Sequence, residues 1–301
     1  MPSIQSKLFT RLASQSMQSM FVNFDVNKLR RWITTLDKLA PAPTDVDVTP
    51  SPLSHCEAEW VRPQRQTDRV ILYFPGGAWV MRTPQAHRRM VAKIAHAANA
   101  DVFLVFYRLA PEHPFPAALE DCLEAYETLL EQGIDASRIV IGGDSAGGNL
   151  TLATLLALRD QDQPVPAGAF TLSACTDLGS ADTGAEFDRE DLDPNMPEPP
   201  EEFDNDPRLL YVGGNKELYE HPYVSPLQGD MKGLCPLLLQ VGGAEWLLEQ
   251  STKFAERARA AGVNAEVEVW EGQPHVWHIM RFPESGRAVE HLSDFIRYSC
   301  P

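Results

Sequence analysis

Gly143-Asp144-Ser145-Ala146-Gly147 is the stretch of this chain that decides its fold. The apolar run at 138–142 predicts a buried strand before it, and the run at 149–159 predicts a helix after it. A serine between a strand and a helix, with glycine two residues to each side, is the nucleophile-elbow pattern. Glycine relieves the collision that so sharp a turn causes, and the Ser145 hydroxyl is held exposed. The motif also arises by chance, because glycine and serine are common, so its value depends on its context.

The context is a regular alternation of short apolar runs with amphipathic ones. The predicted strands lie at 70–74, 102–106, 138–142, 169–172, 237–241 and 265–270, and the predicted helices at 85–98, 117–130, 149–159, 249–261 and 285–298. Apolar strands that alternate with helices indicate an α/β fold, in which a mainly parallel sheet is covered by helices on both faces. In such sheets the sites lie at the carboxyl ends of the strands.

Length and charge limit the classes of protein to which the chain can belong. Its 301 residues suffice for one domain with an elaboration, or at most two domains. The formal net charge of −16 disfavours nucleic acid and anionic membranes as partners, and no apolar run is long enough to span a bilayer. Five cysteines at wide, unpatterned spacing disfavour a disulfide framework and a zinc site. We therefore expect a cytoplasmic protein with no nucleic-acid partner, no stable membrane association and no bound metal.

One segment carries much of the negative charge. Eleven acidic residues and one arginine lie between 181 and 206, together with four prolines. A stretch of this composition forms neither a core strand nor a long helix. We interpret it as a solvated, mobile insertion; the alternative is a lid segment that repels anionic substrates.

Ser145 needs a base, and the parallel sheet indicates where the base must lie. His275 lies in the loop just after the predicted strand at 265–270. His278, three residues further on, is the alternative. The histidines within predicted helices are expected to be surface or packing residues; they are His87, His96 and His291.

The base needs an acid that orients it, and this acid should follow a different strand. Glu245 comes directly after the predicted strand at 237–241 and is the leading candidate, with Glu249 one helical turn later as the alternative. Glu245 would also suit the start of a helix, where the macrodipole favours negative charge. Serine, acid and histidine then follow in the chain order of α/β-hydrolases.

The loop Pro75-Gly76-Gly77-Ala78-Trp79 follows the predicted strand at 70–74. Glycine lets backbone N–H groups approach a substrate oxygen closely, as an oxyanion hole requires. We expect the donors to be the N–H groups of Gly77, Ala78 and Ala146. A Gly-Gly pair alone usually marks a turn, but here four candidate parts of one site follow four separate strands.

These motifs resemble those of the hormone-sensitive-lipase-like family of α/β-hydrolase esterases. The resemblance rests on residues 143–149 and on the run YRLAPEHPFPAA at 107–118. Shorter matches lie at 176–178, 225–226 and 275–277, and the similarity covers roughly residues 60–300. It implies a cofactor-free hydrolase of small, short-acyl carboxylic esters, with Ser145 as nucleophile, His275 as base and Glu245 as acid. The expected partners are the small-molecule ester and, in a homodimer, a second copy of the chain.

The resemblance also implies a helical cap over the site. Residues 1–50 would form N-terminal cap helices and a linker, and residues 51–301 the catalytic domain, with 180–225 as a cap insertion. Within the first of these segments, apolar spacing predicts a helix over 26–40 and prolines predict a linker over 41–52.

The chain departs from the family pattern at two places. Pro75 stands where the family usually has histidine, and proline has no N–H and a fixed φ, so the support of the loop must differ. Glu245-Trp246-Leu247 replaces the common Asp-Pro-Leu, and the longer glutamate requires a slightly different position of the histidine.

The sequence alone does not decide the role of three tryptophans or exclude every other function. Trp79, Trp246 and Trp277 flank three of the loops, and they either line an apolar acyl pocket or pack beneath the loops. An amidase, lactonase or deacetylase could use the same three residues. A ligand receptor on an inactive hydrolase fold is disfavoured, because His275 is present.

Overall fold

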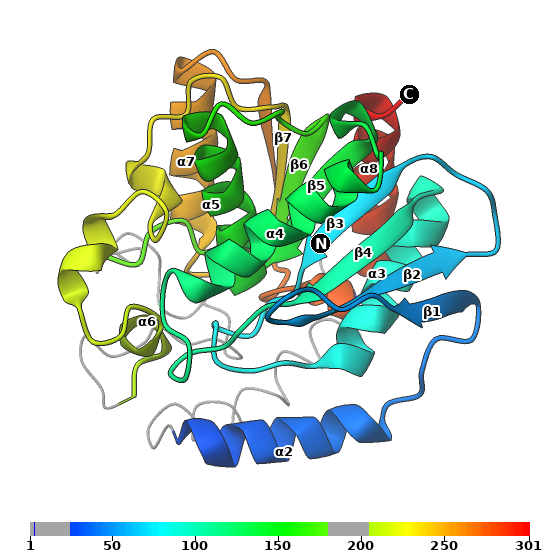
Figure 1. Cartoon of the computed structure of the whole chain (residues 1–301), viewed down its shortest axis with the longest axis horizontal. Helices are drawn as coiled ribbons and strands as arrows, with labels where there is room; N and C mark the ends of the chain where they lie inside the picture. Colours follow the sequence, from blue (N-terminus) through cyan, green and yellow to red (C-terminus); the bar gives the residue numbers. More distant parts are fainter. Residues whose placement is uncertain (1–2, 4–24, 180–204) are drawn as a thin grey trace.

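The computed structural model describes residue 3 and residues 25–179 and 205–301, and an eight-stranded sheet lies at the centre of this part of the chain (Figure 1). The strands are β1 (Val46–Pro50), β2 (Glu57–Pro63), β3 (Val70–Phe74), β4 (Asp101–Phe106), β5 (Ile139–Asp144), β6 (Gly168–Leu172), β7 (Leu237–Gly242) and β8 (Ala265–Trp270). Their order in the sheet is β1-β2-β4-β3-β5-β6-β7-β8. The strands from β4 to β8 pair in parallel, whereas β1 and β2 are antiparallel to their neighbours.

Helices cover both faces of the sheet (Figure 1). One face carries α3 (Pro84–Ala98) and α8 (Pro283–Ser299), and the other carries α4 (Ala117–Glu131), α5 (Ala146–Asp160) and α7 (Leu248–Ala260). Successive side chains of a strand alternate between the two faces. In β3, Leu72 therefore belongs to the apolar cluster on the α4–α5 side, and Tyr73 to the cluster on the α3–α8 side. No helix within the described ranges has both the length and the apolar character that crossing a bilayer requires.

The predicted α/β class and the mainly parallel sheet are confirmed, and each of the six predicted strands is observed within two residues of its expected bounds. The linker predicted over 41–52 is wrong in its second half, because Val46–Pro50 forms β1. Among the described strands β1 pairs with β2 alone, and proline is tolerated at the end of such an edge strand. Residues 1–2 and 4–24 of the predicted N-terminal cap segment (1–50), and residues 180–204 of the predicted insertion (180–225), lie outside the described residues, so the division into domains stays a prediction.

The turn between β5 and α5 has the sharp geometry that its glycines indicate. Ser145 adopts φ 51° and ψ −118°, a conformation that is strained for a residue with a side chain. A Cβ atom on Gly147 would collide with the carbonyl oxygen of Phe74, and one on Gly143 would collide with the backbone of Gly147. The turn that presents Ser145 therefore packs directly on the backbone at the end of β3.

Helix α2 (Val26–Leu39) is held to the loops after β3 and β4 by one arginine. The Arg30 guanidinium donates to the carbonyl oxygens of Val80 and Ala110, at 2.5 and 2.6 Å. It also forms a two-pronged ion pair with Glu112, at 2.6 and 2.9 Å. Both loops leave the carboxyl edge of the sheet, so α2 lies against the edge at which Ser145 is presented (Figure 1).

A second contact joins α2 to the start of α3. The buried Asp37 carboxylate accepts hydrogen bonds from the backbone N–H groups of Gln85 and Ala86, each at 2.9 Å. Thr83, at the N-cap of α3, makes no side-chain cap of its own. Asp37 thus satisfies amides at the N-terminus of α3 that would otherwise lack partners.

Replacing Arg30 by glutamine should loosen α2 and leave the sheet intact. The shorter amide cannot join two carbonyl groups and a carboxylate, and a hydrogen bond to a charged group is worth about 1.5–3 kcal/mol. We expect amide hydrogen exchange in residues 26–39 to accelerate roughly tenfold, with no change in β5. Arg31→Gln, at an exposed arginine on the same helix, is the control. Equal acceleration in both variants, or none in Arg30→Gln, would contradict the anchoring role.

Candidate active site

Ser145 stands at the carboxyl end of β5, where its hydroxyl meets the imidazole of His275. The Ser145 Oγ and His275 Nε2 atoms are 3.0 Å apart, within hydrogen-bond distance. The other ring nitrogen of His275, Nδ1, is 2.7 Å from Oε2 of Glu245. A carboxylate accepts hydrogen bonds, so Nδ1 carries the hydrogen and Nε2 is available to accept from the serine. The structure thus brings together the three side chains that the sequence selects.

The Glu245 carboxylate is buried and its second oxygen has partners of its own. Oε1 accepts from the hydroxyl of Ser173 at 2.6 Å and from the N–H of Gly242 at 2.7 Å. The Ser173 oxygen also accepts from the N–H of Val276, the residue after His275, at 3.1 Å. Ser173 therefore fixes both the acid and the loop that carries the histidine. Sequence reasoning missed it; the available signal was a polar residue directly after the predicted strand at 169–172.

The loop after β3 turns through unusual backbone conformations. Gly77 has φ 137° and Ala78 has φ 51°, in the left-handed range that side chains disfavour. Within the described residues, the N–H groups of Gly77 and Ala78 donate no hydrogen bond to the protein. The third predicted donor, Ala146, is the first residue of α5 and directly follows Ser145. All three predicted donors thus lie at the ends of β3 and β5, which are neighbours in the sheet.

Pro75 needs no N–H, because the loop is held through other backbone groups. The hydroxyl of Tyr107 donates to the carbonyl oxygen of Pro75 at 2.7 Å. The N–H of Gly76 donates to Oδ1 of Asp144 at 3.0 Å. The departure from the family pattern at position 75 therefore leaves the loop anchored at two successive residues.

The three tryptophans differ in their surroundings. Trp79 stacks on Tyr211 of α6 (Pro207–Tyr211), with ring centroids 4.7 Å apart and ring planes at 14°. Trp246 is mostly buried. Trp277 has no exposed surface, and its ring packs against His278 and Trp270. Trp277 therefore packs beneath its loop, and it does not line an open acyl pocket.

With this geometry in place, comparison with known proteins identifies the chain. A family model described as the alpha/beta hydrolase fold matches residues 71–279. This chain belongs to the α/β-hydrolase fold family.

Individual relatives narrow the placement within the family. An acetyl-hydrolase of Streptomyces hygroscopicus is 40% identical over 255 residues, which span 81% of each chain. The crystal structure of an esterase from the bacterial hormone-sensitive lipase family superimposes with a TM-score of 0.89 at 34% identity, covering all of both chains. The esterase EstE5, in a crystal soaked with p-nitrophenyl butyrate, gives 0.89 at 36% identity and 99% coverage of both chains. The resemblance to hormone-sensitive-lipase-like esterases is confirmed, and the chain is an ester hydrolase.

The alternative base, His278, and the alternative acid, Glu249, lie in other surroundings than the three residues above. His278 is fully buried and its Nε2 atom is 2.9 Å from Oε1 of Gln240. Burial lowers the pKa of His278 to about 3, so the ring stays neutral. Glu249 lies on α7 and forms an ion pair with Lys253, one turn further along the same helix. Neither residue contacts Ser145.

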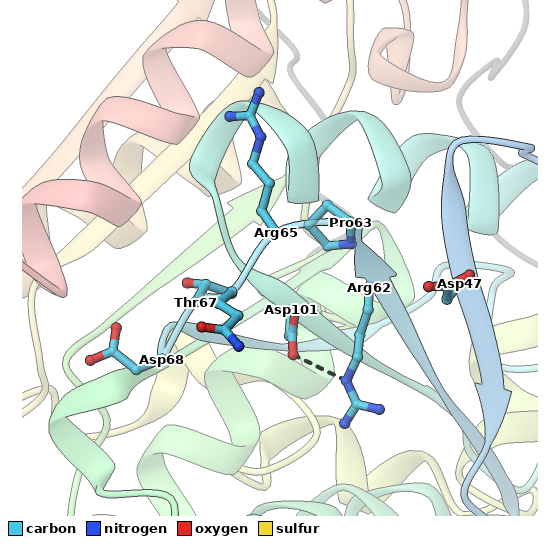
Figure 2. Close-up of a pocket in the computed structure, with 8 residues that line it drawn as sticks. Asp47, Arg62, Pro63, Arg65, Thr67, Asp68 and Asp101 are labelled. Carbon is cyan, nitrogen blue, oxygen red and sulfur yellow. Dashed lines mark hydrogen bonds and ion pairs between the residues drawn. The ribbon is translucent and has the colours of Figure 1, made fainter.

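An open pocket lies at the opposite edge of the sheet, away from the carboxyl ends of the parallel strands (Figure 2). It lies at the start of β4, where the Arg62 Nε atom is 3.1 Å from Oδ2 of Asp101. Its charged residues are of both signs and it contains none of the predicted site residues; it is lined by Asp47, Arg62, Pro63, Arg65, Gln66, Thr67, Asp68 and Asp101. The candidate site is therefore the one at the carboxyl ends of the strands.

Acid should destabilise the fold partly through His278. The unfolded chain binds a proton at this histidine near pH 6.5, whereas the folded protein does so only near pH 3, so stability falls as the pH drops between these values. Replacing His278 by glutamine should reduce the loss of unfolding free energy between about pH 7.5 and about pH 5 by roughly 2 kcal/mol. Urea unfolding of both proteins at the two pH values measures this difference. An equal loss in His278→Gln and in the wild type would contradict the buried neutral state.

Proposed function

We propose that this enzyme hydrolyses small, short-acyl carboxylic esters through an acyl-enzyme on Ser145. The observation that carries the proposal is the continuous contact from the Ser145 hydroxyl through His275 to Glu245, at 3.0 and 2.7 Å. Nucleophile, base and orienting acid within hydrogen-bond reach are the arrangement that acyl transfer requires. The N–H groups of Gly77 and Ala78, which have no acceptor among the described residues, add a place for negative charge beside it.

In the proposed reaction, His275 accepts the hydroxyl proton through Nε2 as the Ser145 oxygen attacks the ester carbonyl carbon. The carbonyl oxygen becomes an oxyanion, which the N–H groups of Gly77, Ala78 and Ala146 stabilise. His275 then gives the proton to the leaving alcohol. Water, activated by the same imidazole, attacks the acyl-enzyme and releases the acid. Glu245 holds the tautomer and balances the imidazolium charge throughout.

The preference for small acyl groups is supported by the relatives. One is named for acetyl hydrolysis, and another was crystallised with a butyrate ester soaked in. The stacked pair of Trp79 and Tyr211 brings two large aromatic side chains to the proposed oxyanion loop, because Trp79 directly follows Ala78. The net charge of −16 disfavours anionic substrates over neutral ones. The homodimer and the cytoplasmic location stay predictions.

Glu245→Gln should lower kcat on p-nitrophenyl acetate by roughly 10³–10⁴-fold, with little change in KM. The amide can present an N–H group to Nδ1 of His275, and this favours the tautomer that cannot accept the serine proton. Glu249→Gln is the matched control, because it removes a second acid close by on α7. It should retain kcat within about twofold. A larger loss in Glu249→Gln than in Glu245→Gln would reverse the assignment of the acid.

A series of p-nitrophenyl esters of increasing acyl length tests the substrate class. We expect the highest kcat/KM between acetyl and hexanoyl, and Ser145→Ala should lower kcat by roughly 10⁴-fold or more throughout the series. Peak activity on long-chain emulsified triglycerides would refute the short-acyl preference.

A fluorophosphonate probe should label the wild type at Ser145. Absence of labelling would favour a ligand receptor, and a faster rate on the matched amide would favour an amidase.

A further inference from the structure

A buried polar cluster lies directly beneath the loop that carries Gly77 and Ala78. At its centre is Asp144, which immediately precedes Ser145 and is 4% exposed. Its Oδ1 atom accepts from the hydroxyl of Tyr73 at 2.8 Å and from the N–H of Gly76 at 3.0 Å. The Nε2 atom of His87 lies 3.2 Å from the same oxygen. The ester-hydrolysis mechanism above uses neither Asp144 nor His87.

Both ring nitrogens of His87 face acceptors. Nδ1 is 3.0 Å from both the carbonyl oxygen and the hydroxyl oxygen of Thr83, the N-cap residue of α3, and Nε2 faces the Asp144 carboxylate. The carboxylate only accepts, so Nε2 carries a hydrogen. A second hydrogen on Nδ1 donates to the Thr83 carbonyl oxygen, which also only accepts, so the imidazolium is the form that uses both acceptors. The geometry therefore favours the imidazolium form. The ring is 3% exposed, which makes an unpaired charge there costly and the pair with Asp144 necessary.

The charges around the pair support the same assignment. Burial by itself would lower the pKa of His87, but the charge and hydrogen bond of Asp144 outweigh burial and raise it. Burial would raise the pKa of Asp144, but its interaction with His87 lowers it. Other titratable groups that face the pair, within the described residues, are Tyr73 on β3, Tyr107 after β4, Asp37 on α2 and His278 after β8. Tyr73 and His278 stay neutral, and Asp37 adds a negative charge that also favours the cation.

Asp144 connects this pair to the proposed oxyanion hole. It holds the N–H of Gly76, the residue before Gly77, and a Cβ atom at position 76 would collide with its carboxylate. The position of the Gly77 and Ala78 amides thus depends on Asp144. An unneutralised carboxylate so close to the nucleophile would also oppose the charge that develops on the substrate oxygen.

We propose that His87 is a positioning residue for the oxyanion hole: as an imidazolium it holds and neutralises Asp144, which in turn fixes Gly76. This role rests on the proposed ester hydrolysis at Ser145. The transition state carries the oxyanion and the bound ester does not, so a defect in this pair lowers kcat and leaves KM nearly unchanged.

The test is a double-mutant cycle on p-nitrophenyl acetate. His87→Gln leaves the buried Asp144 carboxylate without a cationic partner and should lower kcat roughly 10–100-fold, with KM within about threefold. Asp144→Asn combined with His87→Gln removes both charges and should regain about tenfold of that loss. His96→Gln is the matched control: His96 lies on the same helix and pairs with Asp45 at 3.0 Å, so kcat should stay within about twofold. Unchanged kcat in His87→Gln, or a double variant whose loss equals the product of the two single losses, would overturn the proposal.

A measurement on the protonation state itself separates this inference from the function. At about pH 7.5, where an ordinary histidine is neutral, long-range 1H–15N spectra of histidine-labelled wild type should show one ring with both nitrogens protonated. That signal should vanish in His87→Gln, or in the double variant if the single variant does not fold. A wild type without such a ring overturns the proposal for His87. A wild type that shows the ring but cleaves no ester, and takes up no fluorophosphonate, instead refutes the proposed function.

Discussion

The backbone of β3 and the turn that carries Ser145 approach so closely that no side chain fits between them. The absent Cβ of Gly147 would fall on the carbonyl oxygen of Phe74, and in the sheet Phe74 pairs with Gly143. This contact fixes the nucleophile relative to the loop that begins at Pro75, one residue later. Backbone packing in the core thus sets the distance between the hydroxyl and the oxyanion donors, and the Asp144 side chain adds an anchor at Gly76.

The rest of the site follows from the order of the strands. In the sheet β5, β6, β7 and β8 are consecutive neighbours, and each contributes the residue at or just beyond its carboxyl end. Ser145 follows β5 and His275 lies beyond β8, so two strands separate them. Ser173 after β6 and Glu245 after β7 fill the gap, joined to each other at 2.6 Å. The carboxylate can orient the imidazole because every intervening strand end contributes a polar group.

The sequence predicts those parts of the fold and of the site that a local pattern of residues encodes. Five of the six parallel strands are mostly apolar and almost entirely buried, so short apolar runs are sufficient to locate them. In β8, apolar residues alternate with Glu266 and Glu268. Strand β2 contains charged residues and was missed; its buried Glu59 is compensated by Arg88 from α3, at 2.6 and 2.7 Å, which no local pattern reveals. His87 was assigned to surface or packing for the same reason. Its partner Asp144 lies 57 positions away, and only the packing of α3 on the sheet brings the two together.

Pro75 shows why a departure from a family motif need not disable a site. Proline lacks only the N–H, and the group that this loop uses at position 75 is the carbonyl oxygen, which accepts from Tyr107. The fixed φ of proline reduces the freedom of the loop before Gly76, where the next anchor, Asp144, begins. Tyr107 and Asp144 belong to the ends of β4 and β5, the two strands that flank β3 in the sheet. A loop that leaves the middle strand of three can be supported from both sides, so the identity of its first residue matters less than the register of its neighbours.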